Sequence, residues 1–243
     1  MIVFVHGVPE TAELWDPLRG HLDQPSVALS LPGFGCPRPS GFGATKDDYA
    51  EWLAAELKQI EGPIDLVGHD WGAGFTLRVA TAHGDLVRSW VADVGNIVHP
   101  DYEWHDFAKI WQTPGDGEAF WKDQLALPLD QRAAVFEAFA VPHEGAVAMA
   151  SRIDETMAAC ILALYRSAVP NPYADWGSEF GPTTAAGLLL HATEDPFSDE
   201  ERFAGAAELL GARTDRLEGL GHWWALQDPA AGAAALKRFW GSL

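Results

Sequence analysis

The sequence predicts an α/β fold in which helices flank a mostly parallel sheet of about six strands and an inserted helical cap interrupts the sheet. Three observations lead to this prediction. Short apolar runs alternate with helical patterns over residues 1–96 and again over 183–243, as in strands joined by right-handed crossovers. Residues 97–182 show helical periodicity but no convincing strand. A sharp turn of the pattern G-x-D-x-G, at residues 68–72, joins one strand to the next helix.

The first segment contains three predicted strands. Residues 1–5 and 26–29 are short β-rich runs, and leucines at helical intervals over 14–22 favour a short helix between them. Thr45, with an acidic residue three positions later, predicts the N-cap of the following helix. Residues 64–67 then form the apolar strand that leads into the G-x-D-x-G turn.

A fourth strand is expected at residues 87–94, after which the cap begins. Helices are predicted in the cap over 119–127, over 129–140 and, as the longest, over 144–167. The sheet resumes with a strand at 186–191.

The remaining elements complete the α/β pattern. Ser198 and Glu201 have the spacing of a capping box for a helix that reaches about Leu210. A last strand near 214–217 and a helix from Pro229 are expected to follow.

The composition is that of a globular protein with a strongly acidic surface. Its 243 residues include 16 basic and 35 acidic side chains, for a formal charge of −19. This charge disfavours nucleic acid and anionic membranes as partners. Cys36 and Cys160 are far apart in the chain, which excludes a disulfide framework and a cysteine-based metal site. Residues 1–5 lack the features of a signal peptide and no long apolar run is present, so a cytoplasmic protein is expected.

The G-x-D-x-G turn carries the most specific chemical signal. Glycines at 68 and 72 allow strand and helix backbones to approach a turn residue in strained geometry. The residue in the position of a nucleophile is Asp70, where a serine is usual. A carboxylate that attacks an ester carbonyl gives an unstable anhydride, whereas one that attacks a saturated carbon gives an ordinary ester. The substrate is therefore expected to carry an electrophilic carbon with a halide or a strained epoxide oxygen as leaving group.

Two further segments supply partners for this nucleophile. Asp195 follows the strand at 186–191, and a carboxylate just beyond the end of a parallel strand lies on the active face of such a sheet. His222 lies in the loop after the last strand, which gives the chain order nucleophile, acid, histidine. Glu194 and Asp93 are alternatives for the acid.

Together, the G-x-D-x-G turn, the loop His6-Gly7-Val8-Pro9, Asp195 and His222 resemble the α/β-hydrolase superfamily. More narrowly they resemble its branch of epoxide hydrolases and haloalkane dehalogenases. The resemblance covers almost the whole chain, but the two strands with which the family usually begins are absent, so the sheet is expected to be short at its N-terminal end. It implies the α/β-hydrolase fold, with the two strand-bearing segments as one core domain and residues 97–182 as a lid.

The resemblance also implies a mechanism. Asp70 would attack carbon and become an ester, and His222, oriented by Asp195, would activate the water that hydrolyses this ester. The backbone N–H groups of Val8 and Trp71 would form the oxyanion hole. No metal or organic cofactor is implied, because carboxylate, imidazole and water suffice. His6 and His69 are expected to be structural.

The leaving group depends on proton donors in the cap. Tyr165, in the segment Leu164-Tyr165-Arg166-Ser167, resembles one of the two cap tyrosines of epoxide hydrolases. Counting back from Gln112 places Phe107 where the other tyrosine is expected, and phenylalanine donates no proton. Either Tyr165 acts alone, or the leaving group is not an epoxide oxygen, or the second donor comes from Trp104, His105 or Trp111.

We favour an epoxide hydrolase, with a haloalkane or haloacid dehalogenase as the alternative. Trp71 suits both reactions, and Val8 stands where one dehalogenase group carries a halide-binding asparagine. Dehalogenases of halogenated acids usually have an arginine at the position of Trp71. An esterase would need serine at the turn, and a ligand-binding protein without activity would not need Asp70, Asp195 and His222 together.

The cap is rich in aromatic residues, which predicts a pocket for a small apolar or aromatic electrophile, with water as co-substrate. We expect Trp71, Trp104, His105, Phe107 and Trp111 to contact this substrate. The protein is expected to be a monomer or a homodimer.

Overall fold

The computed structural model describes residues 1–243 and contains a six-stranded sheet in which every neighbouring pair of strands is parallel. The predicted fold class is therefore confirmed. The strand order is β2-β1-β3-β4-β5-β6. The strands are β1 (Ile2–Val5), β2 (Ser26–Leu29), β3 (Asp65–Gly68), β4 (Ser89–Ala92), β5 (Ala186–Ala192) and β6 (Arg213–Leu217).

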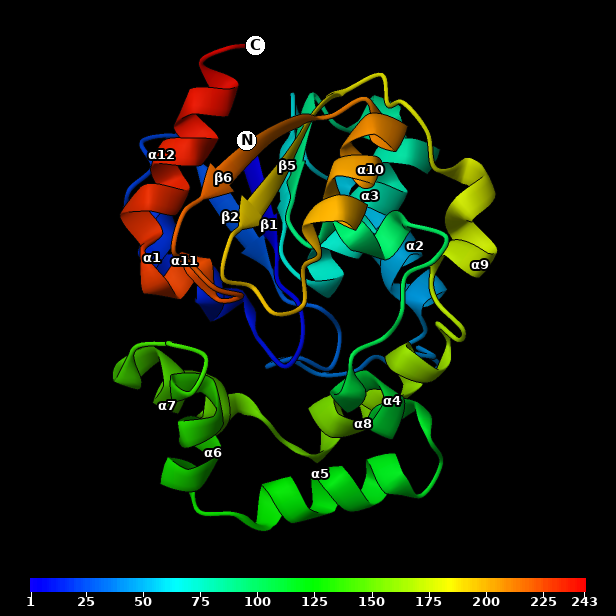
Figure 1. The fold of residues 1–243 in the computed structure, drawn as a ribbon, viewed down its shortest axis with the longest axis vertical. Helices are drawn as coiled ribbons and strands as arrows, with labels where there is room; N and C mark the ends of the chain where they lie inside the picture. The colour runs from blue at the N-terminus through cyan, green and yellow to red at the C-terminus, as the bar shows by residue number, and fades with distance from the viewer.

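Helices cover both faces of the sheet, with α1, α11 and α12 on one side and α2, α3 and α10 on the other (Figure 1). The bounds of these helices are α1 (Asp16–Arg19), α2 (Lys46–Leu57), α3 (Trp71–Ala82), α10 (Glu200–Leu210), α11 (Trp224–Gln227) and α12 (Pro229–Trp240). Short 3₁₀ turns lie at Ala12–Trp15, Gly84–Leu86, Gly95–Val98 and Gly177–Glu179.

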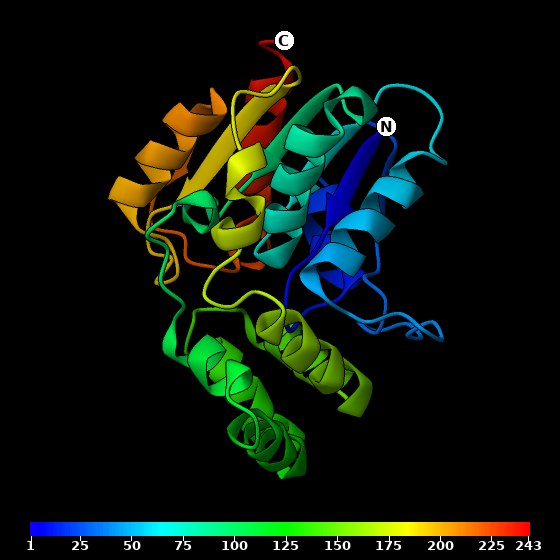
Figure 2. The ribbon, with the colours of Figure 1, turned by 90° about the vertical axis from the view of Figure 1, so that its right-hand side faces the viewer.

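All elements between β4 and β5 are helical. They are α4 (Asp106–Gln112), α5 (Asp116–Ala126), α6 (Leu129–Glu137), α7 (His143–Arg152), α8 (Glu155–Arg166) and α9 (Tyr173–Trp176). The arrowheads of β5 and β6 point toward α4 to α8, which lie beyond the carboxyl ends of the strands (Figures 1 and 2). None of the helices in the chain combines the length and the hydropathy needed to span a bilayer.

The strand order places the loops after β1 and β3 side by side. The chain passes from β1 outward to β2 and then returns to place β3 on the other side of β1. Open α/β sheets bind ligands at such a switch point, in the crevice between loops that leave in opposite directions. Residues 6–10 and 69–70 lie at this position.

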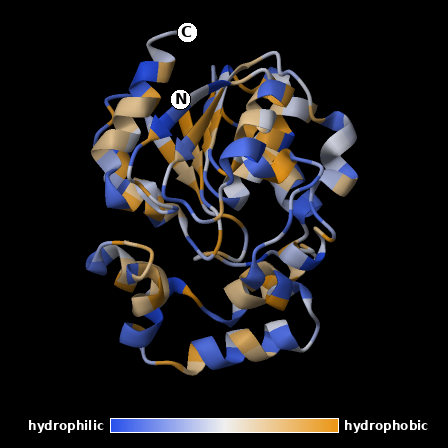
Figure 3. Ribbon diagram, in the orientation of Figure 1, coloured by the Kyte–Doolittle hydropathy of each residue, from blue (hydrophilic) through white to orange (hydrophobic).

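One buried apolar cluster joins the sheet to the cap. It includes strand residues such as Val67 together with Trp104 and Tyr165 from the cap. Trp104 stacks on Trp71 at the start of α3, with ring centroids 5.6 Å apart. Figure 3 shows hydrophobic and hydrophilic stretches alternating along α5, as expected of a helix with one buried side.

Of the two predicted capping boxes, the one at α2 is present and the one at α10 is not. Thr45 accepts a hydrogen bond from the Asp48 amide and donates its own amide to Asp48, which confirms the predicted capping box. The capping box predicted at Ser198 is wrong. Instead Asp199 accepts a hydrogen bond from the Arg202 amide at 2.8 Å, and α10 begins one residue later than expected. Aspartate and serine are comparable N-caps, and here the side chain of Asp199 takes this role.

The single long helix predicted over 144–167 is also wrong, because α7 and α8 are separate. The break lies at Ile153 and Asp154, both in extended backbone conformation. The Asp154 carboxylate accepts a hydrogen bond from the Met157 amide at 2.8 Å and so starts a new helix. The helix α4 was not predicted, and the ring of His105 caps it in place of an ordinary capping residue.

Candidate active site

Asp70 lies at the turn between β3 and α3 in a backbone conformation that is rare for a residue with a side chain. Its φ of 52° and ψ of −122° are held by crowding around the turn. A Cβ atom on Gly68 would lie 2.2 Å from the carbonyl oxygen of Gly72, and one on Gly72 would lie 2.2 Å from that of Val5. Both glycines are therefore required for β1, β3 and α3 to meet at this turn.

The loop after β1 contacts the carboxylate of Asp70 directly. The Val8 amide donates a hydrogen bond to Asp70 Oδ1 at 2.8 Å. A Cβ atom on Gly7 would lie 2.2 Å from the same oxygen, so only glycine fits beside the carboxylate. The backbone amide of Trp71 is among the groups that lower the pKa of Asp70. These two amides are the ones expected to form an oxyanion hole.

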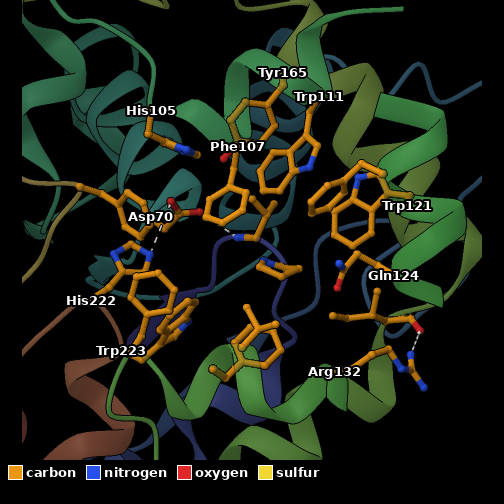
Figure 4. A pocket seen from close by; sticks show the side chains of 18 of the residues that line it. Asp70, His105, Phe107, Trp111, Trp121, Gln124, Arg132, Tyr165, His222 and Trp223 are labelled. Atoms are coloured by element: carbon orange, nitrogen blue, oxygen red, sulfur yellow. Dashed lines mark hydrogen bonds and ion pairs between the residues drawn. The ribbon is translucent and has the colours of Figure 1, made fainter. Parts of the chain in front are cut away.

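His222 lies between two carboxylates from different loops. Its Nδ1 is 2.9 Å from Asp195 Oδ2. Its Nε2 is 3.8 Å from Asp70 Oδ2, on the side of the ring shown in Figure 4. The other oxygen of Asp195 accepts a hydrogen bond from the Phe197 amide at 2.8 Å, which fixes the orientation of the carboxylate. The structure thus brings the three residues Asp70, Asp195 and His222 together.

The two alternative acids lie elsewhere. Glu194 is exposed, and its amide bonds to the carbonyl of Leu220. Asp93 is buried behind the turn, where its Oδ1 accepts the amide of Asp70 at 2.9 Å. Its Oδ2 contacts Nδ1 of His69 at 2.5 Å and accepts the indole N–H of Trp224 at 2.7 Å.

A second buried cluster, formed by Glu10, His69 and Asp93, therefore packs against the turn that contains Asp70. His69 Nε2 is 3.0 Å from Glu10 Oε1, and Glu10 Oε2 accepts the amide of Gly7 at 2.9 Å. The cluster links the loop after β1 to the backbone of the nucleophile. Glu10 was not singled out from the sequence, because its partner is 59 positions away. The one sequence feature that could have indicated Glu10 is its position in the loop after β1, two residues beyond Val8.

Burial and neighbouring charges set the protonation of both clusters. Burial raises the pKa of Asp70 to about 6, against the lowering effect of His222. Burial opposes charge on His222, yet the carboxylate of Asp195 raises the pKa of this histidine above its ordinary value. Burial also opposes charge on His69 and Glu10. Nevertheless, the carboxylates of Asp93 and Glu10 raise the pKa of His69, and His69 lowers the pKa of Glu10 to about 2. The Glu10–His69 pair is thus ionic at neutral pH.

His6 fixes the shape of the loop after β1. Its Nδ1 is 2.8 Å from the carbonyl oxygen of Gly7, and its Nε2 accepts the amide of Leu31 at 3.1 Å. Burial lowers the pKa of His6 to about 4, so the ring is neutral and bridges two backbone segments.

A pocket of about 770 Å³, including its open mouth, lies between the sheet and the cap (Figure 4). Asp70 and His222 line one side of it together with Val8, His105 and Tyr165. Phe107 and Trp111 also line the pocket, although Phe107 is 38% exposed. The other lining residues are Pro9, Phe120, Trp121, Gln124, Leu125, Arg132, Val135, Phe136, Phe139, Ile153, Phe197 and Trp223.

Two of the residues expected to contact substrate lie behind the pocket wall. Trp71 stacks on Phe75 and Trp104, and neither Trp71 nor Trp104 is among the lining residues. The indole N–H of Trp104 donates to the carbonyl of Ala168 at 3.0 Å. The indole N–H of Trp71 is buried and has no hydrogen-bond partner.

The donor atoms that come nearest to a metal site are those of Glu10, His69 and His222, which lie within 4.8 Å of one another. Glu10 Oε1 and His69 Nε2 already pair with each other, and His222 Nδ1 pairs with Asp195.

The family follows from comparison of the sequence with known proteins. The sequence profile of the alpha/beta hydrolase family matches residues 2–235, which is nearly the whole chain. The chain belongs to the alpha/beta hydrolase family. This confirms the family that the motifs predicted.

Within the family, a 2-(acetamidomethylene)succinate hydrolase of Mesorhizobium japonicum is 30% identical over 95 residues, which are 38% of this chain and 34% of that protein. The chain thus matches about a third of the length of this relative. Among solved structures, an epoxide hydrolase of Bacillus megaterium is similar with a TM-score of 0.81 and 18% identity over 99% of this chain and 93% of that one. A haloalkane dehalogenase of Bradyrhizobium elkani is similar with a TM-score of 0.74 and 20% identity over 99% of this chain and 89% of that one. At these identities the similarity shows the fold alone.

Proposed function

We propose that this alpha/beta hydrolase opens an epoxide to a diol through a covalent ester on Asp70. The observation that carries the proposal is a carboxylate at the strained turn with His222 Nε2 at 3.8 Å and Asp195 on the other ring nitrogen. A carboxylate in this position suits attack on a saturated carbon, and the histidine suits hydrolysis of the ester that results.

In the first step, an Asp70 oxygen attacks a ring carbon and the carbon–oxygen bond of the epoxide breaks. The released oxygen needs a proton, and Tyr165 lines the pocket near Asp70 (Figure 4). Burial raises the pKa of Tyr165 well above its ordinary value, so its hydroxyl keeps its proton until negative charge develops on the epoxide oxygen.

His105 is the second donor in this proposal. Its Nδ1 accepts the amide of Ala108 at 3.2 Å, so in the neutral ring the proton resides on Nε2. Burial lowers the pKa of His105 to about 4, which keeps the ring neutral. Because the cap of α4 fixes this tautomer, His105 offers the N–H that Phe107 lacks.

In the second step, His222 takes a proton from water, and the hydroxide attacks the carbonyl carbon of the ester. The negative charge on the Asp70 oxygen is stabilised by the amides of Val8 and Trp71. The ester bond then breaks and the diol departs. One proton of the water passes through His222 to the departing oxygen, the other restores Tyr165, and Asp70 is regenerated.

A dehalogenase reaction is the second candidate. Trp111 lines the pocket, its indole N–H has no hydrogen-bond partner, and such a donor can stabilise a departing halide. The same ester on Asp70 and the same hydrolysis by His222 apply to this reaction.

A paired assay tests the two candidates. Small apolar and aromatic epoxides are assayed for diol, and matched haloalkanes for halide release. Diol formation that is lost in the Asp70→Asn variant is the expected result. Halide release without diol formation selects the second candidate, and the absence of both products overturns the proposed function.

A further inference from the structure

The polar side chains of the pocket lie at two separate ends. Asp70, His105 and His222 are at one end, and Gln124 and Arg132 are at the other. Figure 4 shows Gln124 and Arg132 across the pocket from Asp70 and His222. Apart from Pro9, all the other lining residues are hydrophobic or aromatic. A ligand that fills the pocket therefore meets a reactive end, an apolar middle and a second polar end.

Arg132, on α6, has an unusual hydrogen-bond environment. Its Nη1 donates to the carbonyl oxygen of Ile153 at 3.3 Å. Its Nε is shielded from solvent and has no partner in the protein. Its Nη2 has no hydrogen-bond partner in the protein and, unlike Nε, is not shielded from solvent, so a ligand can reach the guanidinium through this group. A guanidinium N–H donates a strong, charge-assisted hydrogen bond to a carboxylate.

Arg132 also lacks a carboxylate partner in a chain that has an excess of them. Most of the arginines pair with an acidic side chain, as Arg88 does with Asp65 and Arg166 with Glu118. No carboxylate oxygen lies within 4.0 Å of the Arg132 guanidinium, since it takes part in no ion pair. A guanidinium without a counter-ion is costly at the wall of an apolar pocket, and a ligand carboxylate would offset that cost.

We propose that Arg132 binds a carboxylate at the far end of the substrate. The substrate class is then an amphipathic epoxide, in which an apolar chain or ring separates the epoxide from a carboxylate. The apolar segment packs among Trp121, Phe136 and Trp223, and the carboxylate accepts a hydrogen bond from Nη2 of Arg132. The position of the epoxide rests on the proposed function, whereas the binding of the carboxylate does not.

The acidic net charge of the protein repels an anionic ligand, and a local cation would offset this repulsion. A formal charge of −19 disfavours an anionic ligand in bulk solution. A guanidinium inside an apolar pocket acts at short range and at low dielectric, where its attraction for a carboxylate is strongest. Arg132 thus selects for an anionic end among substrates of similar apolar length.

A kinetic test compares epoxyalkanoic acids of increasing length with their methyl esters. The ratio of kcat/KM for acid to that for ester is measured in the wild type and in the Arg132→Gln variant. We expect the ratio to fall by about 10- to 100-fold in this variant, the loss of a charged hydrogen bond. Arg132→Lys keeps the charge but not the planar guanidinium, and its ratio is expected to lie between those of the wild type and Arg132→Gln. An unchanged ratio in Arg132→Gln overturns the inference.

Arg38→Gln is the matched control. Arg38 also has no carboxylate partner, and its Nε donates to the carbonyl of Phe42 at 2.8 Å, away from the pocket. Its substitution is expected to leave the ratio unchanged. An equal fall in the Arg38 variant would assign the effect to net charge and would overturn the role of Arg132.

A binding test separates this inference from the proposed reaction. A saturated medium-chain alkanoate and the matching alcohol are titrated into the protein, with the fluorescence of the tryptophans in the pocket as the signal. We expect the alkanoate to bind at least about tenfold more tightly than the alcohol in the wild type, and the two to bind equally in Arg132→Gln. Tight carboxylate binding without epoxide turnover would refute the proposed reaction alone. Equal binding of both ligands by the wild type would refute the role of Arg132 alone.

Discussion

His222 Nε2 lies 3.8 Å from Asp70 Oδ2, while the Nδ1 of the same ring is 2.9 Å from Asp195. The longer distance exceeds that of a hydrogen bond, so the imidazole is not tied to the carboxylate. A histidine held on one side only is free to bind a water molecule next to Asp70. Because the two side chains are not hydrogen-bonded to each other, Asp70 can attack the substrate first and His222 can transfer a proton in the later step.

The His222→Gln variant is accordingly expected to stop after the first step. Asp70 would still attack the epoxide, but no base would activate water, so the ester would accumulate. Intact-protein mass spectrometry should show an adduct of the mass of the substrate, located on the peptide that contains Asp70. In wild-type protein, repeated turnover in water labelled with oxygen-18 should place label in Asp70. A labelled serine with unmodified Asp70 would contradict the mechanism.

Donors to the epoxide oxygen are expected to contribute unequally. Tyr165→Phe removes the proton itself and should lower kcat for epoxides by about 100-fold or more. His105→Asn keeps a capping side chain for α4 but removes the Nε2 donor, and should lower kcat by about 10- to 100-fold. Single-turnover rates of ester formation measure both effects. Full epoxide activity in Tyr165→Phe would exclude Tyr165 as the proton donor to the epoxide oxygen.

The Glu10–His69 pair is expected to make stability depend on pH. The folded-state pKa of Glu10, about 2, lies below its ordinary value of 4.5. The pair therefore contributes stability above pH 4.5, and this contribution is lost as the pH falls toward 2. Glu10→Gln, which breaks a buried ion pair, should lower the free energy of unfolding at pH 6 by about 3 kcal/mol. Urea unfolding should show this difference shrinking below pH 4.5.

Glu13→Gln serves as the comparison for this measurement. Glu13 pairs with Arg152 on the surface, where both side chains are 51% exposed. Its loss should change the free energy of unfolding by less than about 1 kcal/mol. A Glu10 variant as stable as the Glu13 variant would show that the buried pair adds nothing to stability.

Much of the fold could be predicted because its signals are local. The strands are short apolar runs between turns, and Thr45 and Asp48 form their capping box within one helical turn. The helix predictions that were wrong lie where a neighbouring residue caps the helix instead, or where a capping residue starts a new helix. Asp199 replaced Ser198 as a cap, and Asp154 divided a run whose composition alone favours one helix.

The residues of the candidate site also fall into two groups, those with a local sequence signal and those without one. Asp70, Asp195 and His222 stand out because each follows a predicted strand in a recognisable motif. Glu10 and Arg132 do not, because their environments are made by residues distant in sequence. The isolation of the Arg132 guanidinium depends on how α6 packs on Ile153, which no local pattern encodes.

The contact between Gly7 and Asp70 predicts that Gly7→Ala inactivates the enzyme. The added methyl group would lie 2.2 Å from Asp70 Oδ1, so the carboxylate would have to leave its place beside the Val8 amide. We expect kcat/KM to fall by more than about 100-fold, as for other groups misplaced by an ångström. Gly181→Ala is the control, because an added Cβ atom there has no neighbour within 4 Å.

The pKa of Asp70 predicts how the first step depends on pH. A protonated carboxyl group does not attack, so the rate of ester formation in the wild type should fall as the pH drops below about 6. His222 lowers the pKa of Asp70, so its removal should move this fall to higher pH. Adduct formation in His222→Gln, followed by mass spectrometry with an uncharged epoxide, measures the shifted value directly. A rate of ester formation that stays constant between about pH 8 and about pH 5 would contradict this prediction, because that range extends about a unit or more to either side of the pKa. It would mean that Asp70 is ionised throughout and that burial does not raise its pKa.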